Sequence, residues 1–92
     1  MPDALVDAPA AESGRPLAYY EAVPYLLVVE SVERGGRWLR RAEHPELPGC
    51  FVEAESAVEA MEKLEGERRR LIRTMWELGE TIPAPRAPLR GI

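Results

Sequence analysis

One long amphipathic helix constrains this chain more than any other feature of its sequence. Ser56 and Glu59 have the spacing of a capping box, in which the serine is the N-cap and the glutamate is the third residue of the helix. Gly79 stands where a C′ glycine ends a helix, and Pro83 prevents its continuation. The sequence therefore predicts a helix of about 22 residues, roughly 33 Å long, between Ser56 and Gly79.

The apolar positions of this segment define the face that the helix buries. They recur at intervals of three and four residues, which is typical of a helix packed on one side. These positions are Val58, Met61, Leu64, Leu71, Ile72, Met75 and Leu78. Arg68 falls near the stripe, and we expect its methylenes to lie on the edge of the core and its charge to be exposed.

Three β-rich segments precede the helix. Residues 25–32 are apolar on both faces in their first half, which predicts an interior strand. Gly35 and Gly36 can take the positive φ that a hairpin requires, so residues 37–42 are expected to form an antiparallel second strand. Residues 50–54 predict a third strand.

These segments give an α+β fold class. We expect a three-stranded antiparallel sheet in the order β-β-β-α, with one long amphipathic helix packed on one face. Residues 17–22 predict a turn or a short helix before the sheet, and residues 89–92 could form a short fourth strand.

The segment HPELPGC, residues 44–50, separates the second and third strands. Pro45 keeps the residue before it out of a helix. Pro48 and Gly49 have the form of the two central residues of a type II turn, with the glycine supplying the positive φ. The segment predicts a sharp bend that starts a new strand.

The same segment contains the only histidine and the only cysteine, which raises the alternative of a thiol–imidazole pair. No Asn or Asp lies nearby in the sequence to orient the imidazole of His44. Cys50 begins an apolar strand, where a small buried thiol packs well. We expect a structural cysteine and a surface histidine, and one His with one Cys falls short of the usual metal-ligand set. No catalytic, metal or cofactor residue is predicted.

The predicted helix carries one acidic and one basic set of residues that could be considered functional sites. Glu59, Glu62 and Glu65 are spaced as a solvated helix face. The basic run at residues 68–70 points in three directions around a helix, so it does not form one nucleic-acid-binding stripe.

Composition limits the class of protein. The 92 residues suffice for one domain, 30% of them are charged, and the net charge of -4 argues against general binding to nucleic acid or anionic membranes. We expect no membrane segment and no secretory signal, and a single cysteine suits a reducing, cytoplasmic compartment.

Residues 1–18 are expected to form a flexible tail, residues 19–83 the domain, and residues 84–92 a proline-rich tail. A core of about 65 residues is marginal, so we expect a homodimer or a higher homo-oligomer.

The chain also resembles a known family. YYEAVPYLLVVE, then GG with a tryptophan, HPELPGC, S-x-x-EA at the start of the helix and ELGETIPAP after it are similar to the motif series of HicB-like antitoxins. The matching positions are Tyr25, Gly35, Gly36, Trp38, Pro45, Leu47, Pro48, Gly49, Cys50, Ser56, Glu59, Ala60, Gly79, Ile82 and Pro83.

The resemblance implies a truncated ribonuclease-H-like fold without that superfamily's full acidic active site. Such proteins bind a HicA-type toxin, a small basic mRNA-cleaving ribonuclease, and neutralise it by covering its active surface. Two departures from the family pattern stand out. Few residues follow Pro83, so this reads as a short form without a C-terminal DNA-binding module, and direct DNA binding is not expected. The segment 37–44 is longer than usual, which predicts a bulge or a register change there.

Two other functions remain open at the level of the sequence. One is an orphan HicB-like module that acts as a homo-oligomer in a structural or regulatory role without a toxin partner. The other is a residual ribonuclease-H-like nuclease, which rests on fold analogy alone.

Overall fold

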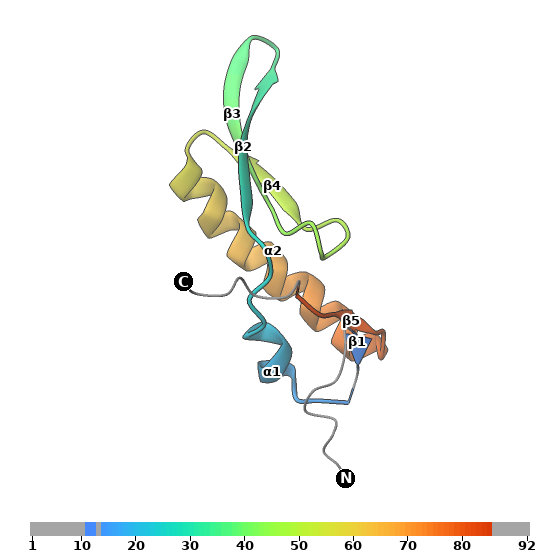
Figure 1. Ribbon diagram of the computed structural model, residues 1–92. Coiled ribbons are helices and arrows are strands. Elements are labelled where there is room, and N and C mark those ends of the chain that lie inside the picture. The colour runs from blue at the N-terminus through green and yellow to red at the C-terminus, as the bar shows by residue number, and fades with distance from the viewer. Residues whose placement is uncertain (1–10, 13, 86–92) are drawn as a thin grey trace, which may run out of the picture.

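The computed structural model describes residues 11–12 and 14–85 of the chain. The elements are β1 (Ala11–Glu12), α1 (Leu17–Glu21), β2 (Val28–Arg34), β3 (Arg37–Glu43), β4 (Phe51–Ala54), α2 (Ala57–Leu78) and β5 (Ile82–Pro83). The strands β2, β3 and β4 form one antiparallel sheet in that order, and α2 packs on it (Figure 1). The predicted α+β fold with one long helix is confirmed.

The two shortest strands join the ends of the described chain. β1 pairs antiparallel with β5 in a separate two-stranded sheet, and β5 is the short further strand of the fold. The carbonyl oxygen of Arg15 also accepts a hydrogen bond from Trp76 Nε1 at 2.8 Å. The described part of residues 1–18 thus lies against the end of α2, whereas the suggested strand at 89–92 lies outside the described residues.

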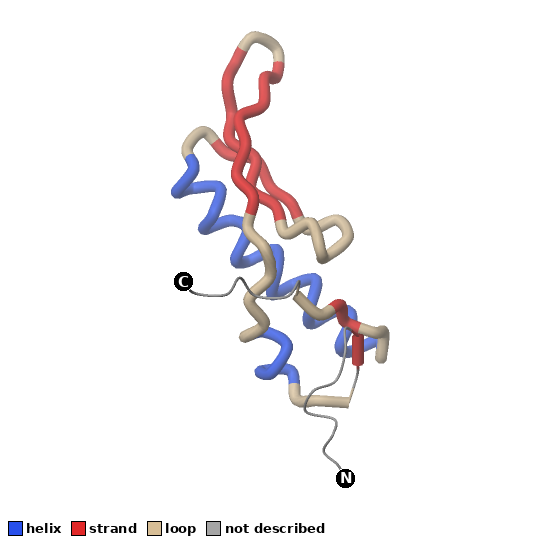
Figure 2. Tube along the Cα trace, viewed as in Figure 1, coloured by secondary structure: helices blue, strands red, loops and turns tan. Residues whose placement is uncertain are grey.

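The hairpin of β2 and β3 has an unbroken register. Gly35 and Gly36 have φ values of 56° and 83°, as a two-residue hairpin turn requires. Every residue of β2 has one partner in β3, from Val28 opposite Glu43 to Arg34 opposite Arg37. The expected bulge or register change is therefore wrong, because the longer segment extends the hairpin instead of interrupting it. Only the last four residues of β3 pair with β4, so the hairpin tip projects as a two-stranded ribbon (Figure 2).

The first strand begins three residues later than predicted. Residues 25–27 belong to no strand, and the corner of residues 44–50 satisfies the backbone of Leu26 in place of a strand partner. Its N–H donates to Glu46 Oε1 at 2.6 Å, and its carbonyl lies 2.8 Å from His44 Nδ1. An apolar pattern cannot distinguish these two ways of satisfying a buried backbone.

The helix α2 has the predicted ends. Ser56 Oγ accepts a hydrogen bond from the backbone N–H of Glu59 at 3.1 Å, and the predicted N-cap is confirmed. Gly79 is left-handed with φ 72°, and its N–H reaches the carbonyl oxygens of Met75 and Trp76. No helix of the described residues is both long and apolar enough to cross a membrane.

The buried stripe of α2 differs from the predicted one at its ends. Its fully packed residues are Ala60, Leu64, Arg68 and Ile72, while Leu71 and Met75 pack beside them. Val58 and Leu78 are 61% and 67% exposed. Val58 lies about 200° around the helix axis from Ala60, so it faces away from the sheet. Leu78 is the last residue of the helix and lies beyond its packed turns.

Candidate protein-interaction surface

The corner between β3 and β4 is built from two consecutive turns. The N–H of Leu47 donates to the carbonyl of His44 at 2.9 Å, and the N–H of Cys50 donates to the carbonyl of Leu47 at 3.0 Å. Gly49 has φ 80°, as the predicted turn requires. The N–H of His44 donates to the carbonyl of Cys50 at 3.0 Å and closes the corner at its base. The predicted bend is confirmed.

The prediction that His44 lies on the surface is wrong. The residue is 9% exposed, and the centroid of its ring lies 6.1 Å from that of Tyr25. Nδ1 lies 2.8 Å from the carbonyl oxygen of Leu26, so the imidazole fastens the corner to the segment that enters β2. The reason was invisible in the sequence, because this partner is a backbone atom 18 residues away.

Cys50 is a buried thiol. Its side chain is 1% exposed, and burial raises the pKa of the Cys50 thiol to about 11. A thiol that stays protonated at neutral pH is a poor nucleophile. The described residues also contain no group of three or more His, Cys, Asp or Glu side chains arranged to hold a metal ion.

Most of the motif residues lie either in the core or at chain reversals. Those in the core are Tyr25, Leu47, Cys50, Ala60 and Ile82, and the hydroxyl of Tyr25 donates to the carbonyl of Pro83 at 2.5 Å. Those at turns or helix ends are Gly35, Gly36, Pro45, Pro48, Gly49, Ser56, Glu59 and Gly79. Trp38, which is 71% exposed, lies in the projecting part of the hairpin. The structure thus gives these residues architectural positions rather than bringing them together in one site.

The expectation that Arg68 exposes its charge is also wrong. Arg68 is 9% exposed, and its Nη1 donates to the carbonyl oxygen of Glu21 at 2.5 Å. Its Nε and Nη2 donate to Glu65 Oε1 at 3.0 and 2.6 Å, and this pairing lowers the pKa of the Glu65 carboxyl. The guanidinium therefore ties the end of α1 to α2. The three-residue spacing of Glu65 and Arg68 predicts their ion pair, but nothing in the sequence predicts the hydrogen bond from Arg68 to the carbonyl of Glu21.

The sheet has one face that no described element covers, which we name the open sheet face. Val29, Ala42, Val52 and Ala54 belong to the other face, where α2 packs. Because side chains alternate along a strand, the residues beside them point away from α2. The open sheet face carries Val28, Val32, Leu39 and Phe51 together with Glu30, Arg34, Arg37, Arg41, Glu43 and Glu53.

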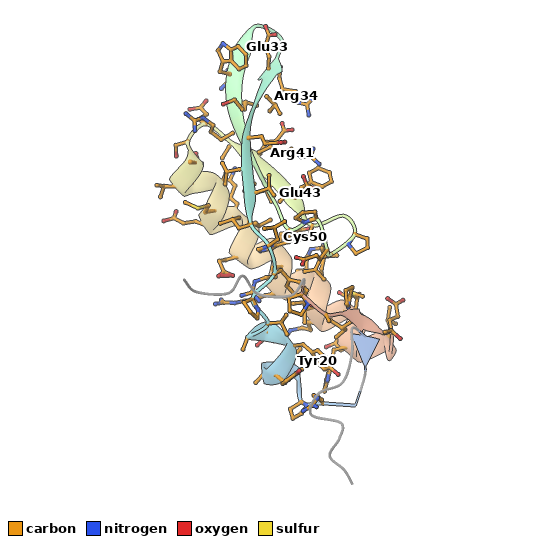
Figure 3. All side chains as sticks on the ribbon, in the orientation of Figure 1. Tyr20, Glu33, Arg34, Arg41, Glu43 and Cys50 are labelled. Carbon is orange, nitrogen blue, oxygen red and sulfur yellow. The ribbon has the colours of Figure 1, made fainter. Side chains whose placement is uncertain are left out.

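The charges of the open sheet face are largely paired with one another. Arg34 bonds Glu53 across β3 at 3.1 and 2.6 Å, and this pairing lowers the pKa of the Glu53 carboxyl. Arg41 lies 3.4 Å from Glu43 and stacks over the ring of Phe51, 4.0 Å from its centroid. Figure 3 shows Arg34, Arg41 and Glu43 along the sheet. The side chains of these pairs are still in contact with solvent, so the pairs contribute little stability. They leave a surface that is partly apolar and partly charged.

This surface was not singled out from the sequence. The sequence does contain a sign of it, because side chains alternate between the two faces along residues 37–43 and 51–54. Once the strand register is known, this alternation places Leu39, Arg41 and Phe51 on the same face. No protein-family model matches the chain, and no curated protein or solved structure matches it either. The likeness to HicB-like antitoxins rests on the quoted motifs.

Proposed function

We propose that this chain is a non-enzymatic HicB-like antitoxin of the cytoplasm. It binds a HicA-type toxin, a small basic mRNA-cleaving ribonuclease, and neutralises it by covering the toxin's active surface. The motif series that runs in order through residues 19–83 carries the proposal. The β-β-β-α order and the tight HPELPGC corner support it, since each motif has a task in the fold.

The open sheet face is the surface that we assign to the toxin. Phe51 is 45% exposed there and presents an aromatic ring backed by Arg41, a residue pair of the kind enriched at interfaces. The net charge of -4 complements a basic partner, which speeds encounter and disfavours acidic competitors. Binding through this face leaves α2 and the core unchanged.

Co-expression with a short, basic neighbouring reading frame tests the proposal. We expect a stable complex and restored growth. Phe51→Glu should weaken the complex, because it replaces the exposed aromatic ring of the assigned surface with a charge. Val58→Glu is the matched control, since Val58 is exposed on α2 and faces away from the sheet. A toxic neighbour that neither binds the chain nor is neutralised by it would contradict the proposal, as would the absence of any toxic neighbour.

A second candidate function is an orphan homo-oligomeric module without a toxin partner. The free outer edge of β2 favours self-association, because an unpaired edge strand can pair with another strand. Light scattering of the pure chain, combined with pull-downs from its host, separates the two functions: a homo-oligomer that captures no small basic protein supports the orphan role.

A further inference from the structure

The strand β2 is an edge strand with an unpaired outer side. It lies at one end of the strand order β2-β3-β4, and no described residue pairs with it on that side. Its seven residues contain no proline or glycine, and its register is regular. A regular, unpaired edge of this kind is ready to pair with another strand. The opposite edge, β4, has only four residues between two chain reversals.

The geometry of the hairpin fixes which backbone groups of β2 point outwards. Arg34 and Arg37 flank a two-residue turn, so they form a hydrogen-bonded pair, and such pairs alternate along the ladder. The hydrogen bond from the His44 N–H to the Cys50 carbonyl agrees with this assignment. It shows that the backbone groups of the even-numbered residues of this segment point towards β4, so those of the odd-numbered residues of β3 point towards β2. The N–H and C=O groups of Val29, Ser31 and Glu33 therefore face the free edge.

We propose that β2 pairs antiparallel with β2 of a second copy of this chain, about a two-fold axis beside Val32. In this register Ser31 lies opposite Glu33 of the second copy, and Glu33 lies opposite its Ser31. Both pairs use the outward backbone groups. The two three-stranded sheets become one six-stranded sheet, and both open sheet faces lie on the same side. This interface goes beyond the proposed toxin binding and does not depend on it.

The side chains of the open sheet face select this register. Val32 lies opposite Val32 of the second copy, and Leu39 flanks each of them, which gives one apolar row across the interface. Glu30 lies opposite Arg34 of the second copy, twice by symmetry. Because Glu53, Arg41 and Glu30 already form one row, the added arginine continues the alternation of charge.

The neighbouring registers lack this complementarity. An axis at Glu30 places the two Glu30 carboxylates opposite each other, and like charges in that position are destabilising. An axis at Ser31 places Glu30 opposite Val32 and Arg34 opposite Val28. Glu30 has no ion pair with another described residue, so its carboxylate is available for the second copy, and Arg34 would be shared between Glu53 of its own chain and Glu30 of the second copy. Figure 3 shows Glu33 and Arg34 at the projecting end of the hairpin, clear of α2.

The size of the contact predicts a weak dimer. Pairing covers about five residues of each strand, and the area that they bury is smaller than that of a stable interface. We therefore expect weak association, with a dissociation constant in about the micromolar range. Analytical ultracentrifugation of the full chain from about 1 μM to 1 mM spans that range. The result expected is a reversible monomer–dimer equilibrium, and a chain that stays monomeric throughout overturns the proposal.

Charge-reversal variants test the register. Glu30→Arg faces Arg34 in a homodimer, and Arg34→Glu faces Glu30, so each should weaken self-association about tenfold or more. An equal mixture of the two variants restores opposite charges at both contacts and should recover a heterodimer. Glu62→Arg makes the same charge change on the exposed side of α2 and should leave the equilibrium unchanged.

Two further results decide the outcome if a variant misfolds. Circular dichroism establishes that each variant is folded, and Ser31→Pro removes one outward N–H without touching the ladder to β3. Loss of the dimer in folded Ser31→Pro supports edge pairing. A wild-type dimer that survives Ser31→Pro, or two charge variants that fail to form a heterodimer when mixed, overturns it. Growth rescue by co-expression is scored separately, so failure of toxin binding does not affect these results.

Discussion

Two glycines show how the same substitution has opposite effects in different backbone settings. Gly49 has φ 80° in the corner turn, a conformation that costs an L-residue about 1–2 kcal/mol. Gly66 lies within α2, and a Cβ there would meet no heavy atom within 4 Å apart from its chain neighbours and the backbone of its own helix. We therefore expect Gly49→Ala to lower the free energy of unfolding, and Gly66→Ala to raise it by about 1 kcal/mol. Urea unfolding of both variants measures this, and changes of the same sign would contradict it.

Cys50 and Tyr25 make the folded chain sensitive to alkaline pH. Burial raises the pKa of Cys50 from 9.0 to about 11 and that of Tyr25 from 10.0 to about 12. In each case the unfolded chain loses its proton first, so stability is full below pH 9 and falls as pH rises towards 12. We expect Cys50→Ala to flatten the loss between pH 9 and 11 in urea titrations. An equally steep loss in that variant would show that Cys50 is not responsible.

At the scale of elements, two ion pairs on α2 share their spacing and differ in their surroundings. Arg68 pairs with Glu65 and also bonds the carbonyl of Glu21, with its side chain 11% exposed. Arg70 pairs with Glu67 and is 62% exposed. We expect Arg68→Met to cost about 1–3 kcal/mol, because it leaves a carbonyl without its donor. Arg70→Met should cost less than about 0.5 kcal/mol.

The measurement is chemical unfolding of both methionine variants and of Arg68→Lys. A lysine cannot reproduce the forked contacts of the guanidinium, so Arg68→Lys should recover only part of the loss. Equal costs at positions 68 and 70 would mean that Arg68 does not fasten α1 to α2.

The elements themselves were largely predictable from the sequence, because their signals are local. The capping box at Ser56, the glycines of the hairpin and the turn at Gly49 each act within a few residues. The errors at His44 and Arg68 have one common cause. Each side chain bonds a backbone carbonyl that is distant in the sequence, and the spacing of apolar and polar residues cannot predict such a partner. The open sheet face was missed for a related reason, because it requires the strand register as well as the alternation.

At the scale of the whole molecule, a small core is spread over a long helix and an extended hairpin. Ten apolar residues are buried in the described part of the chain, and the hairpin projects beyond α2 (Figure 1). A core of this size leaves little margin against conformational entropy. Edge pairing at β2 would supply the missing stability through a second copy, which links the size of the core to the free edge.

This link predicts a melting temperature that depends on protein concentration. A dimer that forms only from folded chains stabilises them by mass action, so a hundredfold increase in concentration should raise the melting temperature by roughly 5 °C. Glu30→Arg should melt at a lower temperature than the wild type at each concentration, because its dimer is weaker, whereas the control Glu62→Arg should keep the wild-type dependence. Differential scanning calorimetry at protein concentrations from about 10 μM to about 1 mM measures the melting temperature. This range extends upwards from the roughly micromolar dissociation constant expected of a small interface. A wild-type melting temperature that does not change over this range would mean that the folded chain gains no stability from self-association.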